Sequence, residues 1–259
     1  MPRNVFFVFV FTFISLFSVN VLASQSIIYN QFMPDNDLWK EDSLDNKSLP
    51  NVNQKMFLKI VNAALQAYAY DRPTINARWE DPIVNANCSR ENNRVTINMY
   101  GGLARRPEIT PEGFTLVLCH ELGHAYAGKP YIRSTPGYYL SSEGQADYYS
   151  TLSCYDKIAG LVSELSKVDS TTDYITQACE RFASDRVLLA NCIGKLEGGL
   201  SLGNLLSKLS RQGDPNYENP DPTIVPRTLT GYPATVQCRL DTYHAGTLSL
   251  PRPKCWFKN

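Results

Sequence analysis

Residues 110–128, TPEGFTLVLCHELGHAYAG, carry both the start and the stop signals of a helix. The stretch opens with threonine, a capping residue, and proline, which suits the first helical position, and it closes with glycine, a common helix terminator. Side chains four positions apart lie on one face of a helix, so His120 and His124 can both reach one ion. The apolar residues before them indicate burial. We therefore expect a buried helix over residues 111–127 that presents two imidazoles to a metal.

Glu143 is the candidate third ligand, nineteen positions after His124. It lies near the start of a second expected helix, from about residue 141 to residue 158, which can fold against the first. Two histidines and one glutamate leave the fourth position of a tetrahedral zinc ion for water, and this is the catalytic arrangement. Asp147, one turn after Glu143, can accept a hydrogen bond from a ligand histidine and so orient its ring. The pattern predicts a Zn2+ ion held by His120, His124 and Glu143.

The HExxH pattern of residues 120–124 and the ExxAD pattern of residues 143–147 together resemble the gluzincin metallopeptidases. The chain is most similar to the CaaX prenyl endopeptidase group and its soluble relatives, over about residues 53–158. The resemblance implies a zincin-type fold, with zinc bound by the two histidines and Glu143. It also implies Glu121 as the general base, the role that its position after the first histidine predicts.

The C-terminal tail is the expected source of the group that stabilises the substrate oxyanion. A tetrahedral intermediate needs a hydrogen-bond donor opposite the metal. The prenyl endopeptidase group often carries a His-Pro segment followed by an arginine, and Tyr232 with Arg239 is a loose counterpart. We expect Arg239 or His244 to contact the oxyanion, with a slight preference for Arg239; Tyr138 and Tyr139 are the next candidates. Alternatively, Arg239 pairs with an acid and His244 is an ordinary polar surface residue.

The first residues have the layout of a secretory signal peptide. A short basic leader precedes an apolar run, and small residues stand before a cleavage site near Ala23. An uncleaved membrane anchor over residues 5–22 is the alternative, because that run would just span a bilayer. The polar residues in the run and the site at Ala23 favour cleavage of residues 1–23. We expect a secreted or periplasmic protein without a membrane span.

The rest of the chain is expected to form one α+β domain with an arm and a tail. Residues 24–52 are polar and predict a loose N-terminal arm, residues 53–212 a zinc metallopeptidase domain, and residues 213–259 a proline-rich tail of loops that packs on the same domain. The domain should contain a small mixed sheet. Helices are expected over residues 53–70, 172–190 and 202–210, and strands over residues 75–79 and 94–100. The last strand is either an ordinary strand or a sheet edge that pairs with a peptide.

Seven cysteines without a Cys-x-x-Cys pair indicate disulfides rather than a zinc ribbon or a thioredoxin-type redox site. Cys238 and Cys255 would close a short loop in the tail. Another bridge is expected within the helical region, among Cys154, Cys179 and Cys192. Cys119, inside the motif helix, should be buried, either free or bridged. One thiol is left over.

The composition excludes several classes of protein. Lysine and arginine total 25 against 25 aspartate and glutamate, so the chain lacks the excess of positive charge that is typical of nucleic-acid binding. Hydrophobic residues at 43% and charged residues at 19% are typical of a folded globular chain.

From the motifs and the signal peptide, we expect an exported zinc peptidase that acts on peptide or protein substrates. The alternatives are a non-catalytic, zinc-stabilised binding or assembly factor of the envelope, and a zinc hydrolase of a non-peptide amide.

Overall fold

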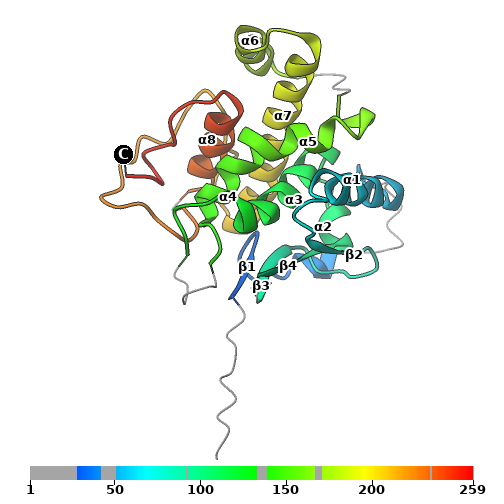
Figure 1. Ribbon diagram of the computed structural model, residues 1–259. Helices are drawn as coiled ribbons and strands as arrows, with labels where there is room; N and C mark the ends of the chain where they lie inside the picture. Colours follow the sequence, from blue (N-terminus) through cyan, green and yellow to red (C-terminus); the bar gives the residue numbers. More distant parts are fainter. Residues whose placement is uncertain are drawn as a thin grey trace, which may run out of the picture.

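The computed structural model describes residues 28–41, 51–91, 93–132, 139–166, 171–233 and 235–258. The expected signal peptide, residues 1–23, and Tyr138 lie outside the described residues. Within these ranges, no helix combines the length and the apolar composition that are needed to cross a bilayer. The fold is α+β, as expected: a small mixed sheet packs against a larger group of helices (Figure 1).

The described strands form one sheet in the order β1-β3-β4-β2. They are β1 (Ile28–Gln31), β2 (Thr74–Arg78), β3 (Ala86–Glu91) and β4 (Arg94–Tyr100). β3 pairs antiparallel with both β1 and β4, whereas β2 lies parallel to β4. β4 alternates as expected, with Val95, Ile97 and Met99 buried. It lies inside the sheet, so its interpretation as an edge that pairs with a peptide is wrong.

One row of residues crosses the sheet on its buried face. Asn30 of β1 pairs with Cys88 of β3, Cys88 pairs with Ile97 of β4, and Ile97 pairs with Ile75 of β2. Paired side chains share a face of a sheet. Because Cys88 and Ile97 are fully buried, the Asn30 side chain also points inward, toward the helices.

The interpretation of residues 24–52 as a loose arm is wrong where the structure describes them. The segment contributes β1 and a short 3-10 helix, η1 (Leu38–Glu41). Phe32 and Met33, directly after β1, are fully buried in the core. The Phe32 N–H also donates to the Ala86 carbonyl at 3.0 Å. These apolar contacts hold a segment that its polar composition alone predicted to be loose.

α3 is the central helix of the fold. The Thr110 side chain accepts a hydrogen bond from the Gly113 N–H at 3.1 Å and thereby caps the helix, as the sequence predicts. Every residue from 113 to 125 is buried, because the sheet and several helices surround α3. The α-helices are α1 (Gln54–Ala67), α2 (Gly101–Ala104), α3 (Pro111–Tyr126), α4 (Glu143–Tyr149), α5 (Tyr155–Ala159), α6 (Asp173–Phe182), α7 (Arg186–Ser210) and α8 (Val236–Thr247).

Two expected helix boundaries are wrong. Residues 172–190 do not form one helix, because the Asp185 side chain accepts hydrogen bonds from two N–H groups of the following turn and starts α7 there. α7 then continues through the expected helix at residues 202–210. α4 does continue to about residue 159, through a π-helical turn, η2 (Ser150–Cys154), and α5.

The tail is also more regular than expected. After Gly213, the prolines do keep the chain in loops, but Thr235 caps α8 by accepting a hydrogen bond from the Cys238 N–H at 3.1 Å. α8 packs against α4 and α7. The tail therefore lies on the same domain, next to the helix that begins at Glu143 (Figure 1).

Among the described residues, three disulfides are formed: Cys119–Cys154, Cys179–Cys192 and Cys238–Cys255. The last pair is the one expected in the tail. Cys119 is bridged to the end of η2, so this disulfide ties α3 to the segment that follows α4. Cys88 carries a free, buried thiol.

Candidate metal centre

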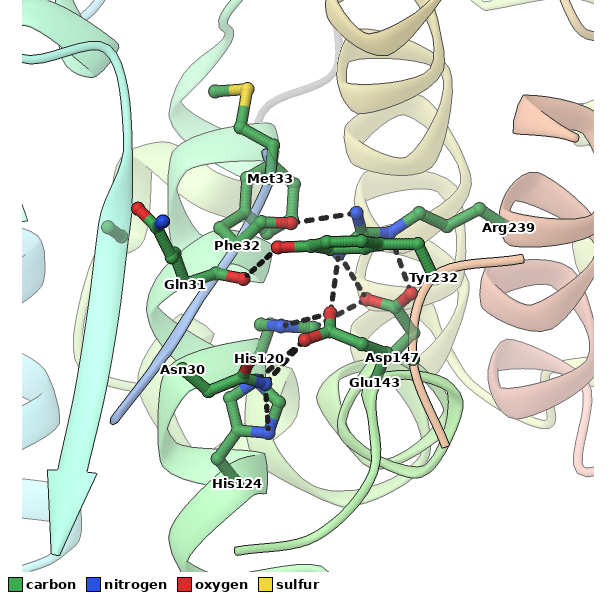
Figure 2. A network of polar contacts seen from close by, with 12 residues as sticks. Asn30, Gln31, Phe32, Met33, His120, His124, Glu143, Asp147, Tyr232 and Arg239 are labelled. Atoms are coloured by element: carbon green, nitrogen blue, oxygen red, sulfur yellow. Dashed lines mark hydrogen bonds and ion pairs between the residues drawn. The ribbon is translucent and has the colours of Figure 1, made fainter. Parts of the chain in front are cut away.

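His120, His124 and Glu143 are brought together where the start of α4 crosses α3 (Figure 2). His120 Nε2 lies 3.4 Å from Glu143 Oε2, and His124 Nε2 lies 3.7 Å from Glu143 Oε1. Two atoms bound to one tetrahedral zinc ion at about 2.0–2.2 Å are about 3.4 Å apart. All three side chains are buried. One ligand atom from each residue lies within 4.8 Å of the others, so their spacing and chemistry fit a single metal ion such as zinc.

Gly123 lets the two ligand helices approach each other. A methyl group on Gly123 would lie 2.8 Å from the Ala146 Cα atom and 2.9 Å from the Ala146 oxygen, both in the backbone of α4. Ser141, two residues before α4, is also held against α3, because its N–H donates to the His124 carbonyl at 2.8 Å. Glycine at the centre of the motif thus sets the distance between the histidines and Glu143.

Each histidine has a hydrogen-bond partner for its Nδ1 atom, which leaves Nε2 to face the ligand cluster. His124 Nδ1 lies 2.8 Å from the Ser141 carbonyl oxygen, and His120 Nδ1 lies 2.6 Å from Asp147 Oδ1. A proton on Nδ1 donates to these oxygens and leaves the Nε2 lone pair for a metal. Asp147 is fully buried.

Arg239 and Tyr243 of α8 hold Asp147. Arg239 Nε and Nη2 lie 2.7 and 3.2 Å from the two oxygens of Asp147, and the Tyr243 hydroxyl donates to Oδ1 at 2.8 Å. Burial opposes ionisation of Asp147, but Arg239 and His120 outweigh it, so the pKa of Asp147 is lowered. Arg239 is itself buried, and its Nη1 atom donates to the Phe32 carbonyl at 2.8 Å. The structure therefore places Arg239 on Asp147, in an ion pair with an acid.

Glu121 is a buried carboxylate whose two oxygens make no hydrogen bond with any described residue. His120 Nε2 and Glu143 Oε2 also lack one. Buried polar atoms without hydrogen bonds are rare, and each calls for an explanation such as an ion. Glu121 interacts electrostatically with His120 and Glu143, so these buried atoms without hydrogen bonds support a cation bound near them.

Burial and charge shift the pKa values of the same residues. Burial raises the pKa of Glu121 to about 8, although the His120 charge acts in the opposite direction. Burial and the nearby His120 lower the pKa of His124 to about 4. Burial would also lower the pKa of His120, but the Asp147 and Glu143 carboxylates outweigh it and raise that pKa to about 9. Without a metal, protons therefore compensate the buried carboxylates.

Of the other residues proposed from the sequence, His244 lies elsewhere. It packs on the Tyr217 ring, with ring centres 5.3 Å apart, and its Nε2 atom lies 3.1 Å from the Tyr174 hydroxyl. The guanidinium carbon of Arg90 lies over the Tyr139 ring, 5.0 Å from the ring centre. The structure brings neither residue into the ligand cluster, so the expected contact of His244 with the oxyanion is not supported.

Two residues beside the ligands were not identified as site residues from the sequence. Asn30 Nδ2 lies 3.0 Å from His124 Nε2 and donates a hydrogen bond to Glu143 Oε1. The Tyr232 hydroxyl donates to the Gln31 carbonyl at 2.7 Å, and its ring lies over the cluster (Figure 2). The sequence could have indicated Tyr232, because it stands where the prenyl endopeptidase group often has histidine. No such indication existed for Asn30, which belongs to a polar segment 94 positions before His124.

Comparison with known proteins found no matching family model, no matching curated protein and no matching solved structure.

Proposed function

We propose that this chain is an exported, zinc-dependent peptidase of gluzincin type. The main observation behind the proposal is that His120, His124 and Glu143 are buried with their ligand atoms within 4.8 Å of one another. The carboxylate of Glu121, which has no hydrogen-bond partner among the described residues, interacts electrostatically with His120 and Glu143. When bound there, zinc supplies a Lewis acid that polarises the scissile carbonyl and lowers the pKa of a water molecule. A purely structural site would need the ligands but not Glu121.

Glu121 accepts a proton from the attacking water and passes it to the leaving amine. Its buried carboxylate makes no hydrogen bond with any described residue, so both of its oxygens are available to accept that proton. Asp147 keeps the His120 ring in the orientation and tautomer that present Nε2. Arg239 is a positioning residue, since it acts on Asp147 rather than on the reacting atoms.

An extended peptide is the substrate that the surroundings of the site favour. β1 crosses the ligand cluster in an extended conformation (Figure 2). The carbonyl of Gln31, its last residue, accepts a hydrogen bond from Tyr232, and the carbonyl of Phe32, directly after it, accepts one from Arg239. A mostly apolar cleft borders these two side chains. It is lined by Pro34, Leu206, Leu209, Tyr232, Pro233 and Val236, among others. Main-chain pairing with pockets for side chains is how sheet edges bind peptides.

The disulfides support export. Structural disulfides persist in oxidising compartments such as the periplasm or the cell exterior, and six of the seven cysteines are paired within the described residues. A secreted or periplasmic protein that acts on peptides, without a nucleic-acid partner, is consistent with this chemistry.

The test is Glu121→Gln, with Glu112→Gln at the start of the same helix as the matched control. Both variants should fold and bind one zinc ion, but only Glu121→Gln should lose hydrolysis of a peptide library, because an amide cannot accept the proton. Since the Asn30 amide lies against two ligand atoms, each variant is also made in an Asn30→Ala background. Zinc-loaded protein that cleaves no peptide in either background, or unchanged cleavage by Glu121→Gln, would contradict the proposal.

The alternative of a non-catalytic zinc-stabilised binding factor has one observation in its favour, the position of Asn30 within the ligand cluster. A capped metal is typical of structural sites. On that alternative, Glu121→Gln would leave the cellular role of the protein intact, whereas loss of the role together with hydrolysis favours the peptidase.

A further inference from the structure

We propose that Asn30 is the fourth protein ligand of the metal in the resting chain, so that β1 holds the site closed. This inference rests on the zinc site proposed above and adds a residue and a state to it. Its starting point is the contact of the Asn30 side chain with two of the three ligands (Figure 2).

The distances place the Asn30 amide beside an ion bound to His124 and Glu143. His124 Nε2 and Glu143 Oε1 are 3.7 Å apart, and Asn30 Nδ2 lies 3.0 Å from the first and within hydrogen-bond distance of the second. An ion at bonding distance from both atoms therefore lies within about 3 Å of the amide. The amide nitrogen has no lone pair to offer a cation, but half a turn of the amide group puts its oxygen in the same place. Oxygen is an ordinary zinc ligand.

β1 is anchored on both sides of Asn30. Before and at Asn30, the strand is paired with β3. After it, the Phe32 ring is fully buried, 5.3 Å from the His120 ring and 4.3 Å from the Arg239 guanidinium. The side chain of Asn30 is thus aimed at the ligands by the pairing and by the packing of Phe32.

A fourth protein ligand has a chemical consequence. Zinc with four protein ligands is closed, whereas catalytic zinc keeps a position for water and substrate. Withdrawal of Asn30 would open that position. Departure of β1 from β3 would also leave β3 as the sheet edge beside the ligands, where an extended peptide could take the place of β1. The resting chain is therefore latent, and displacement of β1 activates it.

The experiment measures access to the metal without measuring activity. The parent and the variants Asn30→Ala, Asn30→Asp and Asn76→Ala are loaded with Co2+, whose visible spectrum reports its ligands, and titrated with acetohydroxamate, which needs free coordination positions. Asn76→Ala is the matched control. Asn76 lies on β2, the strand at the opposite edge of the sheet, and its side-chain amide donates a hydrogen bond to Asn98 Oδ1 at 2.9 Å. Asn30→Ala should bind hydroxamate at least ten-fold more tightly than the parent and Asn76→Ala.

Asn30→Asp keeps the inference testable if Asn30→Ala folds poorly. A carboxylate at position 30 should close the site further, so Co2+ should bind more tightly and hydroxamate no better than in the parent. Equal hydroxamate affinity in the parent and Asn30→Ala, with Co2+ bound to both, would overturn the role of Asn30 and leave the metal site standing. Failure of every protein to bind Co2+ would overturn the inference and the proposed zinc site together.

Discussion

Replacing Gly123 by alanine should separate the metal ligands without altering any of them. The new methyl group would lie 2.8 Å from the Ala146 Cα atom, whereas carbon atoms in contact are at least about 3.5 Å apart. α3 and α4 must therefore separate by about 0.7 Å. A zinc site tolerates errors of about 0.2 Å in its distances, so the histidines and Glu143 can no longer bind one ion with good geometry.

The stability effect has a matched control in Gly198→Ala. Gly198 of α7 packs on α3 with the same closeness, since its methyl group would lie 2.9 Å from the Glu112 carbonyl carbon. Alanine favours a helix over glycine by about 1 kcal/mol, but overpacking costs about 1–3 kcal/mol. Both variants should therefore lose up to about 2 kcal/mol in free energy of unfolding as metal-free proteins. Only Gly123→Ala should also bind zinc about 10- to 100-fold more weakly.

Two measurements decide the matter: urea unfolding in the presence of EDTA, and zinc affinity by competition with a coloured chelator. Parental zinc affinity in Gly123→Ala, at a loss of stability similar to that of Gly198→Ala, would refute the argument that the approach of α4 to Gly123 sets the ligand distances. Equal loss of zinc affinity in both variants would also refute it, because the effect would then be general.

Two further predictions concern the charges around the metal. Asp147→Asn keeps the shape but removes the carboxylate that pairs with the buried Arg239 guanidinium at 2.7 Å, while Glu143 Oε2 remains 3.8 Å from it. Chemical unfolding should therefore reveal a loss of about 3–5 kcal/mol in free energy of unfolding, and chelator competition should show a zinc affinity that is about 10- to 100-fold weaker. An unchanged stability would contradict the importance of the buried Asp147–Arg239 pair. Zinc binding at pH 7 should release nearly two protons, because the pKa values of His120 and Glu121 are raised to about 9 and about 8 and both protons must leave. Calorimetry in buffers of different ionisation enthalpy measures the number of protons released, which should fall above pH 9. Release of no protons at pH 7 would contradict the prediction.

Local signals were sufficient for the helices that carry the ligands. Thr110 and the proline after it predicted the start of α3, and the spacing of its histidines does not depend on any distant contact. Glu143 was recognisable because it opens a helix after a serine. The proposed ligands lie on two helices whose starts are marked by nearby residues, and the fold only has to bring these two helices together.

The residues that complete the site come from long-range pairing, which local patterns do not encode. β1 is short, and only its pairing with β3 makes it a strand; Asn30 therefore gave no signal. α8 was missed because prolines dominate its surroundings, although Thr235 was available as a cap. With α8 recognised, Tyr243 would have followed from its position one turn after Arg239, on the same face.

The charge of the buried cluster explains why a divalent ion suits it. Glu121, Glu143 and Asp147 bring three negative charges into the interior, and Arg239 brings one positive charge. The remaining imbalance of two equals the charge of one zinc ion, and buried charges are costly unless they are paired. Without the ion, the raised pKa values of His120 and Glu121 supply the same compensation as two protons. A bound cation would displace the proton from Glu121 and leave it as a carboxylate, which is the form that a general base requires.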